Sequence, residues 1–214
     1  MATETRIPGT DTRDHFQVFG LPRKLNIDVD ALQQEFYRQS RKLHPDLFVN
    51  APTARQVWSM EQSSRLNDAF RTLKDPITRT RYLLELEGVK LEEQSSSATQ
   101  AARESGQEKL QAVPPELLEE VFELNMQLQE MKMGGGDPEV RRTLESQRQH
   151  FEAMLSTIGD ELRRLWDKWD DVIAKAKPEG ERAMVRDEMV TLLNRRNYVR
   201  NLVRDVNAAL EGGV

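Results

Sequence analysis

The sequence VDALQQEFYRQSRKLHPD (29–46) combines an amphipathic helical pattern with a triplet that must end it. Its first fifteen residues repeat apolar side chains at helical spacing, which predicts a helix. Pro45 cannot continue that helix, and it disfavours the helical conformation at His44. The sequence TARQVWSMEQSSRLNDAFRTL (53–73) predicts a second helix by the same periodicity. We therefore expect His44, Pro45 and Asp46 to lie in an exposed loop between two packed helices.

The apolar residues of these two helices define the contact that we expect between them. They are Leu32, Phe36 and Leu43 on the first helix and Val57, Met60, Leu66, Phe70 and Leu73 on the second. Arg38, Arg41 and Lys42 lie off the apolar face of the first helix. Such charges are commonly a solvated helix face. The two interpretations are nearly even, and the position of these residues within two turns of the loop favours a basic surface that steers an acidic partner.

The composition of the 214-residue chain excludes several classes of protein. Hydrophobic residues make up 37% and aromatic residues 6%, which favours slender helical bundles over a large β core. The net charge of −5 argues against general binding of nucleic acid. Without cysteine, the chain has no disulfide, thiol chemistry or cysteine-ligated metal. Its three histidines are far apart in sequence, so we expect no metal site and no cofactor.

Membrane association and catalysis also lack sequence signals. No apolar run approaches the roughly 20 residues of a membrane helix, and the N-terminal residues show no hydrophobic signal core. We therefore expect a cytoplasmic protein, most simply bacterial, without membrane contact. Neither a nucleotide-binding glycine loop nor a nucleophile elbow occurs. A hydrolase built on His44 and Asp46 would lack a nucleophile and a third orienting group, so we predict no enzyme activity.

Changes in composition divide the chain into two helical parts. We expect a disordered N-terminus at 1–13, a first domain at 14–91, a flexible linker at 92–113 and a second domain at 114–214. The linker is rich in Ser and Gln and carries too few bulky apolar groups to order itself. No alternating strand pattern occurs anywhere, so the predicted fold class is all-α.

The second domain shows three long helical stretches that begin near residues 115, 137 and 181. Their apolar residues recur three and four positions apart. On the first stretch this stripe is Leu117, Val121, Leu124, Leu128 and Met131. Short turns with Gly and Pro between the stretches favour an antiparallel three-helix bundle over an isolated coiled coil.

The first helix of this bundle carries more apolar surface than one contact requires. Leu118, Phe122 and Met126 form a second line at four-residue spacing, flanked by carboxylates that include Glu123 and Glu130. The residues alone favour the simpler interpretation, in which this line widens the core face of the helix. A partner-binding surface is the alternative.

The first domain resembles the J-domain, the module that activates DnaK-type ATPases. The resemblance rests on DHFQVFGLP (14–22), the HPD triplet and LNDAFRTLKDP (66–76), which follow one another in that order. It covers about residues 14–90. The chaperone-binding residues that it implies are His44, Pro45, Asp46, Arg38, Arg41 and Lys42.

The whole chain resembles HscB, the J-protein family of iron–sulfur cluster assembly, in which a J-domain precedes a three-helix bundle. HPDLF (44–48) and RYLLELEGVKL (81–91) are closer to HscB than to general DnaJ. DnaJ would also show a Gly/Phe-rich segment and cysteine zinc repeats. The resemblance implies a co-chaperone that stimulates a DnaK- or HscA-type ATPase and delivers an IscU-like scaffold protein to it.

The same resemblance implies a scaffold-binding surface on the bundle. Its residues are Leu118, Phe122, Glu123, Met126, Glu130 and Tyr198. The chain departs from the family pattern at Glu119, where HscB can have an apolar residue, and at Met126, where it can have an acid. A J-domain adaptor for a different client, and a structural coiled-coil protein with an accidental HPD, are the alternatives.

Overall fold

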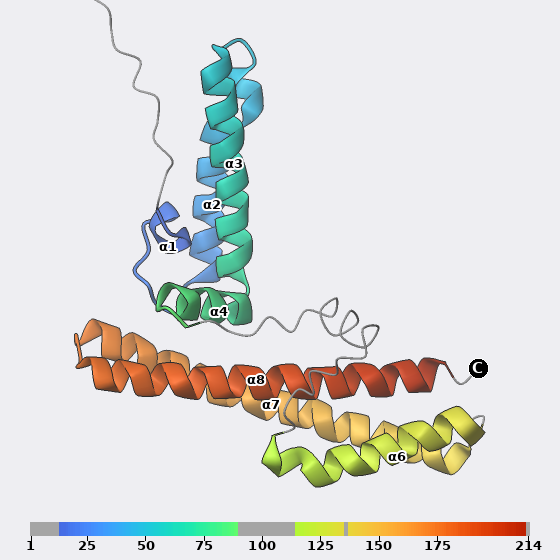
Figure 1. Cartoon of the computed structure of the whole chain (residues 1–214). Helices are drawn as coiled ribbons and strands as arrows, with labels where there is room; N and C mark the ends of the chain where they lie inside the picture. Colours follow the sequence, from blue (N-terminus) through green and yellow to red (C-terminus); the bar gives the residue numbers. More distant parts are fainter. Residues whose placement is uncertain (1–12, 90–113, 135–136, 213–214) are drawn as a thin grey trace, which may run out of the picture. The chain divides into compact units, whose positions relative to one another are not determined.

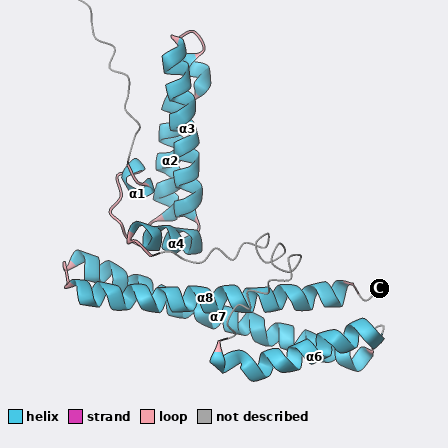
Figure 2. Cartoon of the chain, viewed as in Figure 1, coloured by secondary structure: helices cyan, strands magenta, loops and turns pink. Residues whose placement is uncertain are grey.

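The computed structural model consists of helices and their connections (Figures 1 and 2). It describes residues 13–89, 114–134 and 137–212. Within these ranges no strand occurs, and the all-α fold class is confirmed. The predicted linker at 92–113 and all but the last residue of the predicted disordered N-terminus lie outside the described residues.

The chain separates into two compact units. The first comprises Met1–Leu91 with Trp169–Lys175, and the second comprises Glu92–Lys168 with Ala176–Val214. Two findings hold for the described residues of both units. No helix among them is long and apolar enough to cross a membrane. No group of three or more His, Asp or Glu side chains among them is arranged to hold a metal ion.

Aspartates begin three of the helices of the first unit. Its elements are α1 (His15–Val18), α2 (Val29–Leu43), the short 3-10 helix η1 (Pro45–Phe48), α3 (Thr53–Lys74) and α4 (Pro76–Leu86). The carboxylates of Asp14, Asp28 and Asp75 accept hydrogen bonds from first-turn backbone N–H groups at 2.7–2.9 Å. After α4, Gly88 has a φ of 82°, the left-handed conformation that commonly ends a helix.

The contact between α2 and α3 forms the core of the first unit. Leu32, Leu66 and Leu73 are at most 3% exposed, and the rings of Phe36 and Phe70 stack with centroids 4.3 Å apart. The two helices lie side by side (Figure 1). Helical periodicity therefore placed most of the contact correctly.

The predicted contact is wrong at Val57 and Met60, whose side chains are 48% and 61% exposed. An α-helix turns about 100° per residue, so both point away from the side of α3 that carries Leu66. Ser59 occupies the inward position and is fully buried. Apolar character alone selected residues from two different sides of α3.

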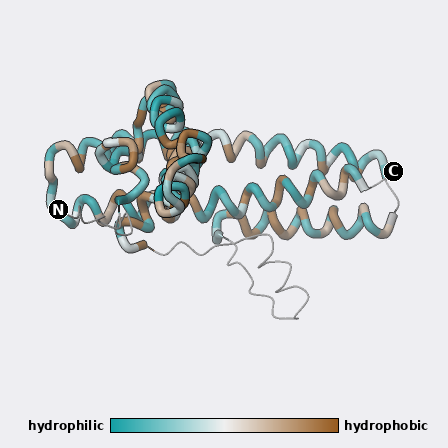
Figure 3. Tube along the Cα trace, turned by 90° about the horizontal axis from the view of Figure 1, so that it is seen from above, coloured by the Kyte–Doolittle hydropathy of each residue, from teal (hydrophilic) through white to brown (hydrophobic). Residues whose placement is uncertain are grey.

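The second unit is built from three long helices. Its elements are η2 (Pro115–Leu117), α6 (Leu118–Gly134), α7 (Pro138–Ala174), which belongs to this unit as far as Lys168, and α8 (Glu179–Glu211). α7 and α8 lie side by side and run in opposite directions, and α6 lies alongside them (Figure 1). Figure 3 shows hydrophobic positions recurring between hydrophilic ones along the helix that ends near the C label.

One stripe from each helix fills the core of the second unit. On η2 and α6, Leu117, Val121, Leu124 and Met131 are buried and Leu128 is half-buried. On α7, Leu144, Phe151, Ile158 and Leu162 are fully buried. On α8, Met189, Leu193, Val199 and Val206 are fully buried. Because each stripe faces the others, no helix of this unit would bury its apolar side alone.

Candidate functional site

The triplet His44, Pro45 and Asp46, called the HPD loop below, joins α2 to α3 through η1. His44 ends α2 with a ψ of 128°, the extended conformation that a following proline favours. The backbone N–H of Asp46 donates a hydrogen bond to Nδ1 of His44 at 3.3 Å. The side chains of His44 and Asp46 are 56% and 83% exposed. Both side chains therefore face solvent from a turn that a local hydrogen bond stabilises.

Two serines of α3 fix the end of α2 directly before the HPD loop. The hydroxyls of Ser59 and Ser63 both donate to the carbonyl oxygen of Leu43, at 2.7 and 2.8 Å. The last carbonyls of a helix lack partners within the helix, so these bonds satisfy a group that would otherwise need water. Sequence reasoning missed this anchor. The available signal was a polar residue, Ser59, at an inward position of α3.

The basic face consists of Arg38, Arg41 and Lys42, and its members differ in their surroundings. Arg38 binds Glu35 through two nitrogens, at 2.6 and 2.5 Å. Hydrogen bonding to Arg38 lowers the pKa of Glu35 to about 2, and Gln39 and the charge of Lys42 contribute further. The side chains of Arg41 and Lys42 are exposed. Because Glu35 partly neutralises Arg38, the outward charge of this face comes mainly from Arg41 and Lys42.

Leu118, Phe122 and Met126, called the α6 strip below, are 55%, 66% and 58% exposed. The interpretation that they widen the core face is therefore wrong. At about 100° per residue, they lie roughly 100–180° around the helix from Leu117, beyond the reach of the other helices. Glu123, beside the strip, is also exposed. The strip is a continuous apolar line in contact with water.

Glu130 and Tyr198 complete the predicted scaffold-binding set. Glu130 is exposed on α6, whereas Tyr198 is 8% exposed, and its burial raises the pKa of its phenol. Tyr198 lies one turn along α8 from Arg195, whose guanidinium is 3.8 Å from the carboxylate of Glu116. This part of α8 therefore lies beside the start of α6. Tyr198 packs inside the unit and presents little surface, unlike the α6 strip.

Comparison with solved structures identifies the fold of this chain. No family model matches the chain. The structure of the chaperone HscB from Vibrio cholerae is similar with a TM-score of 0.57 at 20% identity, covering 94% of this chain and 100% of that one. The crystal structure of the human co-chaperone protein HscB is similar with a TM-score of 0.56 at 21% identity, covering 92% and 82%.

The chain has the fold of HscB. The resemblance expected from the sequence is thus confirmed for the fold, over nearly the whole length of both chains. In this chain the HPD loop belongs to the first unit and the α6 strip to the second.

Proposed function

We propose that this protein is a J-type co-chaperone of iron–sulfur cluster assembly and not an enzyme. The observation that carries the proposal is an exposed HPD loop between two packed helices in a chain with the HscB fold. In this proposal the first unit is a J-domain and the second is an antiparallel three-helix bundle that binds the client. The partners are a DnaK- or HscA-type ATPase and an IscU-like scaffold protein, in the cytoplasm.

The HPD loop acts on the ATPase by preferring one of its conformations. A ligand shifts an equilibrium only through its difference in affinity for the two states, so the loop must bind the hydrolysis-competent state more tightly. Asp46 offers a carboxylate to an arginine of the partner, and His44 offers an N–H donor or a stacking surface. Pro45 restricts the backbone between them, which lowers the entropy lost on binding.

The α6 strip binds the scaffold protein. Three exposed apolar side chains in line give a surface that loses contact with water when a partner covers it. The carboxylates of Glu123 and Glu130 supply a polar rim, which orients a partner with basic groups at its edge. Because both partners bind one chain, each raises the effective concentration of the other.

ATP turnover by a DnaK- or HscA-type chaperone tests the proposal. Single-turnover hydrolysis is measured alone, with this protein, and with this protein plus an IscU-like scaffold. We expect this protein to accelerate hydrolysis and the scaffold to accelerate it further. Absence of acceleration with every DnaK-type chaperone of the same cell would contradict the J-protein function. Acceleration without any scaffold binding would instead favour an adaptor for a different client.

A further inference from the structure

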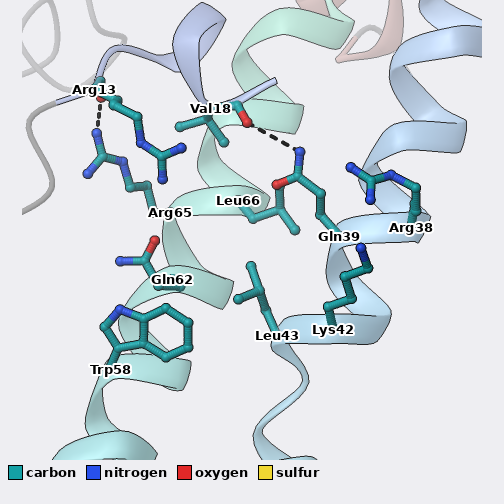
Figure 4. A pocket seen from close by; sticks show the side chains of 10 residues that line it. All are labelled: Arg13, Val18, Arg38, Gln39, Lys42, Leu43, Trp58, Gln62, Arg65 and Leu66. Carbon is teal, nitrogen blue, oxygen red and sulfur yellow. Dashed lines mark hydrogen bonds between the residues drawn. The ribbon is translucent and has the colours of Figure 1, made fainter. Parts of the chain in front are cut away.

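A cavity of about 260 Å³ lies between α2 and α3, next to Arg13 (Figure 4). Four of its ten lining side chains are cationic: Arg13, Arg38, Lys42 and Arg65. None of the ten is acidic. Because Glu35 partly neutralises Arg38, the positive charge of this lining comes mainly from Arg13, Lys42 and Arg65, and it favours an anionic occupant. Because ligand pockets for drug-sized molecules measure about 300–1,000 Å³, this cavity suits one side chain better than a nucleotide.

The cations come from both walls of the cavity. Arg38 and Lys42 lie on the α2 side, and Arg65 lies on the α3 side together with the neutral Gln62 (Figure 4). The guanidinium of Arg65 donates a hydrogen bond to the backbone carbonyl of Arg13, which holds it at the cavity. An arginine fixed in this way is preorganised for a carboxylate, since it loses little side-chain entropy on binding.

The pKa of His15, a neighbour of Arg65, is lowered in the folded protein. Burial lowers it first, and the charge of Arg65 lowers it further, while Asp68 and Asp14 oppose the change. The charge of Arg65 therefore acts on a neighbouring group, against the opposing charges of the two aspartates.

The other six lining residues are four apolar ones and the two amides Gln39 and Gln62. Leu43, Leu66 and Trp58 supply hydrocarbon and indole surface beside the cations (Figure 4). The side chain of Gln39 donates to the carbonyl oxygen of Val18 at 3.2 Å at the edge of the cavity. Cations next to apolar side chains match an anion carried on a hydrocarbon stem, as in Glu or Asp. Free phosphate would use the cations and leave the apolar side chains uncovered.

We infer that this cavity receives an acidic side chain of the partner ATPase, with Arg65 as a recognition residue. The inference rests on the proposed function, since it assigns the occupant to the same partner. The supporting observation is continuity, because Arg38 and Lys42 belong both to the cavity and to the basic face beside the HPD loop. Arg65 lies on α3, outside that face. It would extend the contact with the partner ATPase from α2 to α3. The cavity contributes affinity, whereas the HPD loop selects the activated state.

Two variants test the inference by separate means. Arg65→Glu reverses the charge on the α3 wall. Gln62→Glu fills the cavity with a carboxylate of the chain itself and leaves the bond from Arg65 to Arg13 in place. Arg71→Glu is the matched control, because Arg71 is also on α3 and its side chain is 80% exposed but does not line the cavity. ATPase stimulation is titrated against each variant, with thermal unfolding measured on the same samples.

We expect Arg65→Glu and Gln62→Glu to raise the half-maximal concentration about tenfold or more, with maximal stimulation retained. Gln62→Glu should also leave the melting temperature unchanged or higher. Equal effects of Arg65→Glu and Arg71→Glu would overturn the inference, because general electrostatics would then suffice. Stabilisation of the protein by inorganic phosphate, with normal ATPase affinity in both variants, would overturn it in favour of a free anion. If the wild-type protein gives no stimulation, the proposed function itself fails. That result differs from a failure of the inference, in which the wild-type protein stimulates and the variants bind normally.

Discussion

The backbone N–H of Asp46 donates to Nδ1 of His44, so the two outer residues of the HPD loop are joined across Pro45. When Nδ1 of a neutral imidazole accepts, Nε2 carries the proton and is the donor. The carboxylate of Asp46 lies 3.5 Å from the same Nδ1, and with 83% of the side chain exposed it also faces solvent. The loop therefore presents one donor and one acceptor on a short, restricted backbone.

Our first prediction concerns this pair. His44→Gln or Asp46→Asn should abolish stimulation of the ATPase, because each removes one of the two presented groups. Both side chains are exposed, so the free energy of unfolding should change by no more than about 0.5 kcal/mol. Asp68→Asn, at another exposed aspartate of the first unit, is the control. ATP turnover and urea unfolding measure both quantities, and normal stimulation by either loop variant would contradict the proposed role.

The second prediction concerns the basic face. Reversing Arg41 and Lys42 to Glu should weaken ATPase binding most at low salt, because exposed charges are screened over about 10 Å at 0.1 M salt. Arg163→Glu with Arg164→Glu makes the same charge change at an exposed pair on α7 and should have little effect. Affinity measured at several salt concentrations decides this. A loss of affinity that is equally large at high salt would indicate misfolding.

The third prediction uses the ion pair between Glu35 and Arg38. Glu35 has a pKa of about 2 in the folded protein, below its ordinary value of 4.5. The pair therefore stabilises the fold above about pH 4.5, and this contribution is lost as the pH falls toward 2. In Arg38→Gln the pKa of Glu35 should rise toward the ordinary value, since the largest cause is removed. Carboxyl titration by NMR measures it, and an unchanged pKa would contradict the assignment.

The fourth prediction concerns the two serines that anchor α2. Ser59→Ala and Ser63→Ala should each cost about 0.5–1.5 kcal/mol, the usual worth of one hydrogen bond. The double variant should cost more than the sum, because the carbonyl of Leu43 then loses both of its donors. Ser64→Ala, at the exposed neighbour, is the control. Urea unfolding measures the difference, and strict additivity within about 0.3–0.5 kcal/mol would show that the bonds act independently.

The serine anchor also shows what a single sequence conveys. Helical periodicity identified the helices and the buried stripe on α6, because those patterns repeat over several turns. It failed at Val57 and Met60, which are apolar but lie on the outer side of α3, while Ser59 is buried. Polar core residues of this kind depend on one partner, the carbonyl of Leu43, on another helix. No local pattern encodes that partner.

The same limit applies to the two candidate surfaces. The HPD loop was predictable because proline and its neighbours dictate a local conformation. The exposure of Leu118 was not, since a second apolar line on a helix is buried or exposed according to how many helices surround it. The buried position of Tyr198 and the cavity beside Arg65 likewise depend on packing between separate segments.

The last prediction concerns the α6 strip. Leu118→Ala with Phe122→Ala should lower the affinity for an IscU-like scaffold tenfold or more, because an apolar side chain buried at an interface contributes about 1.5–3 kcal/mol. Both side chains are more than half exposed in the free protein, so the melting temperature should change little. Isothermal titration calorimetry and thermal unfolding on the same samples measure the two effects.

Two control variants separate docking from folding. Leu124→Ala removes a side chain that is 1% exposed on the inner side of the same helix, and it should destabilise the protein by about 2–5 kcal/mol. Met184→Ala removes a side chain that is 63% exposed on α8, and it should change neither stability nor affinity. If the strip variant unfolds as readily as Leu124→Ala, its side chains stabilise the fold. If it binds the scaffold as tightly as Met184→Ala does, the client docks elsewhere, since exposed apolar area alone does not define an interface.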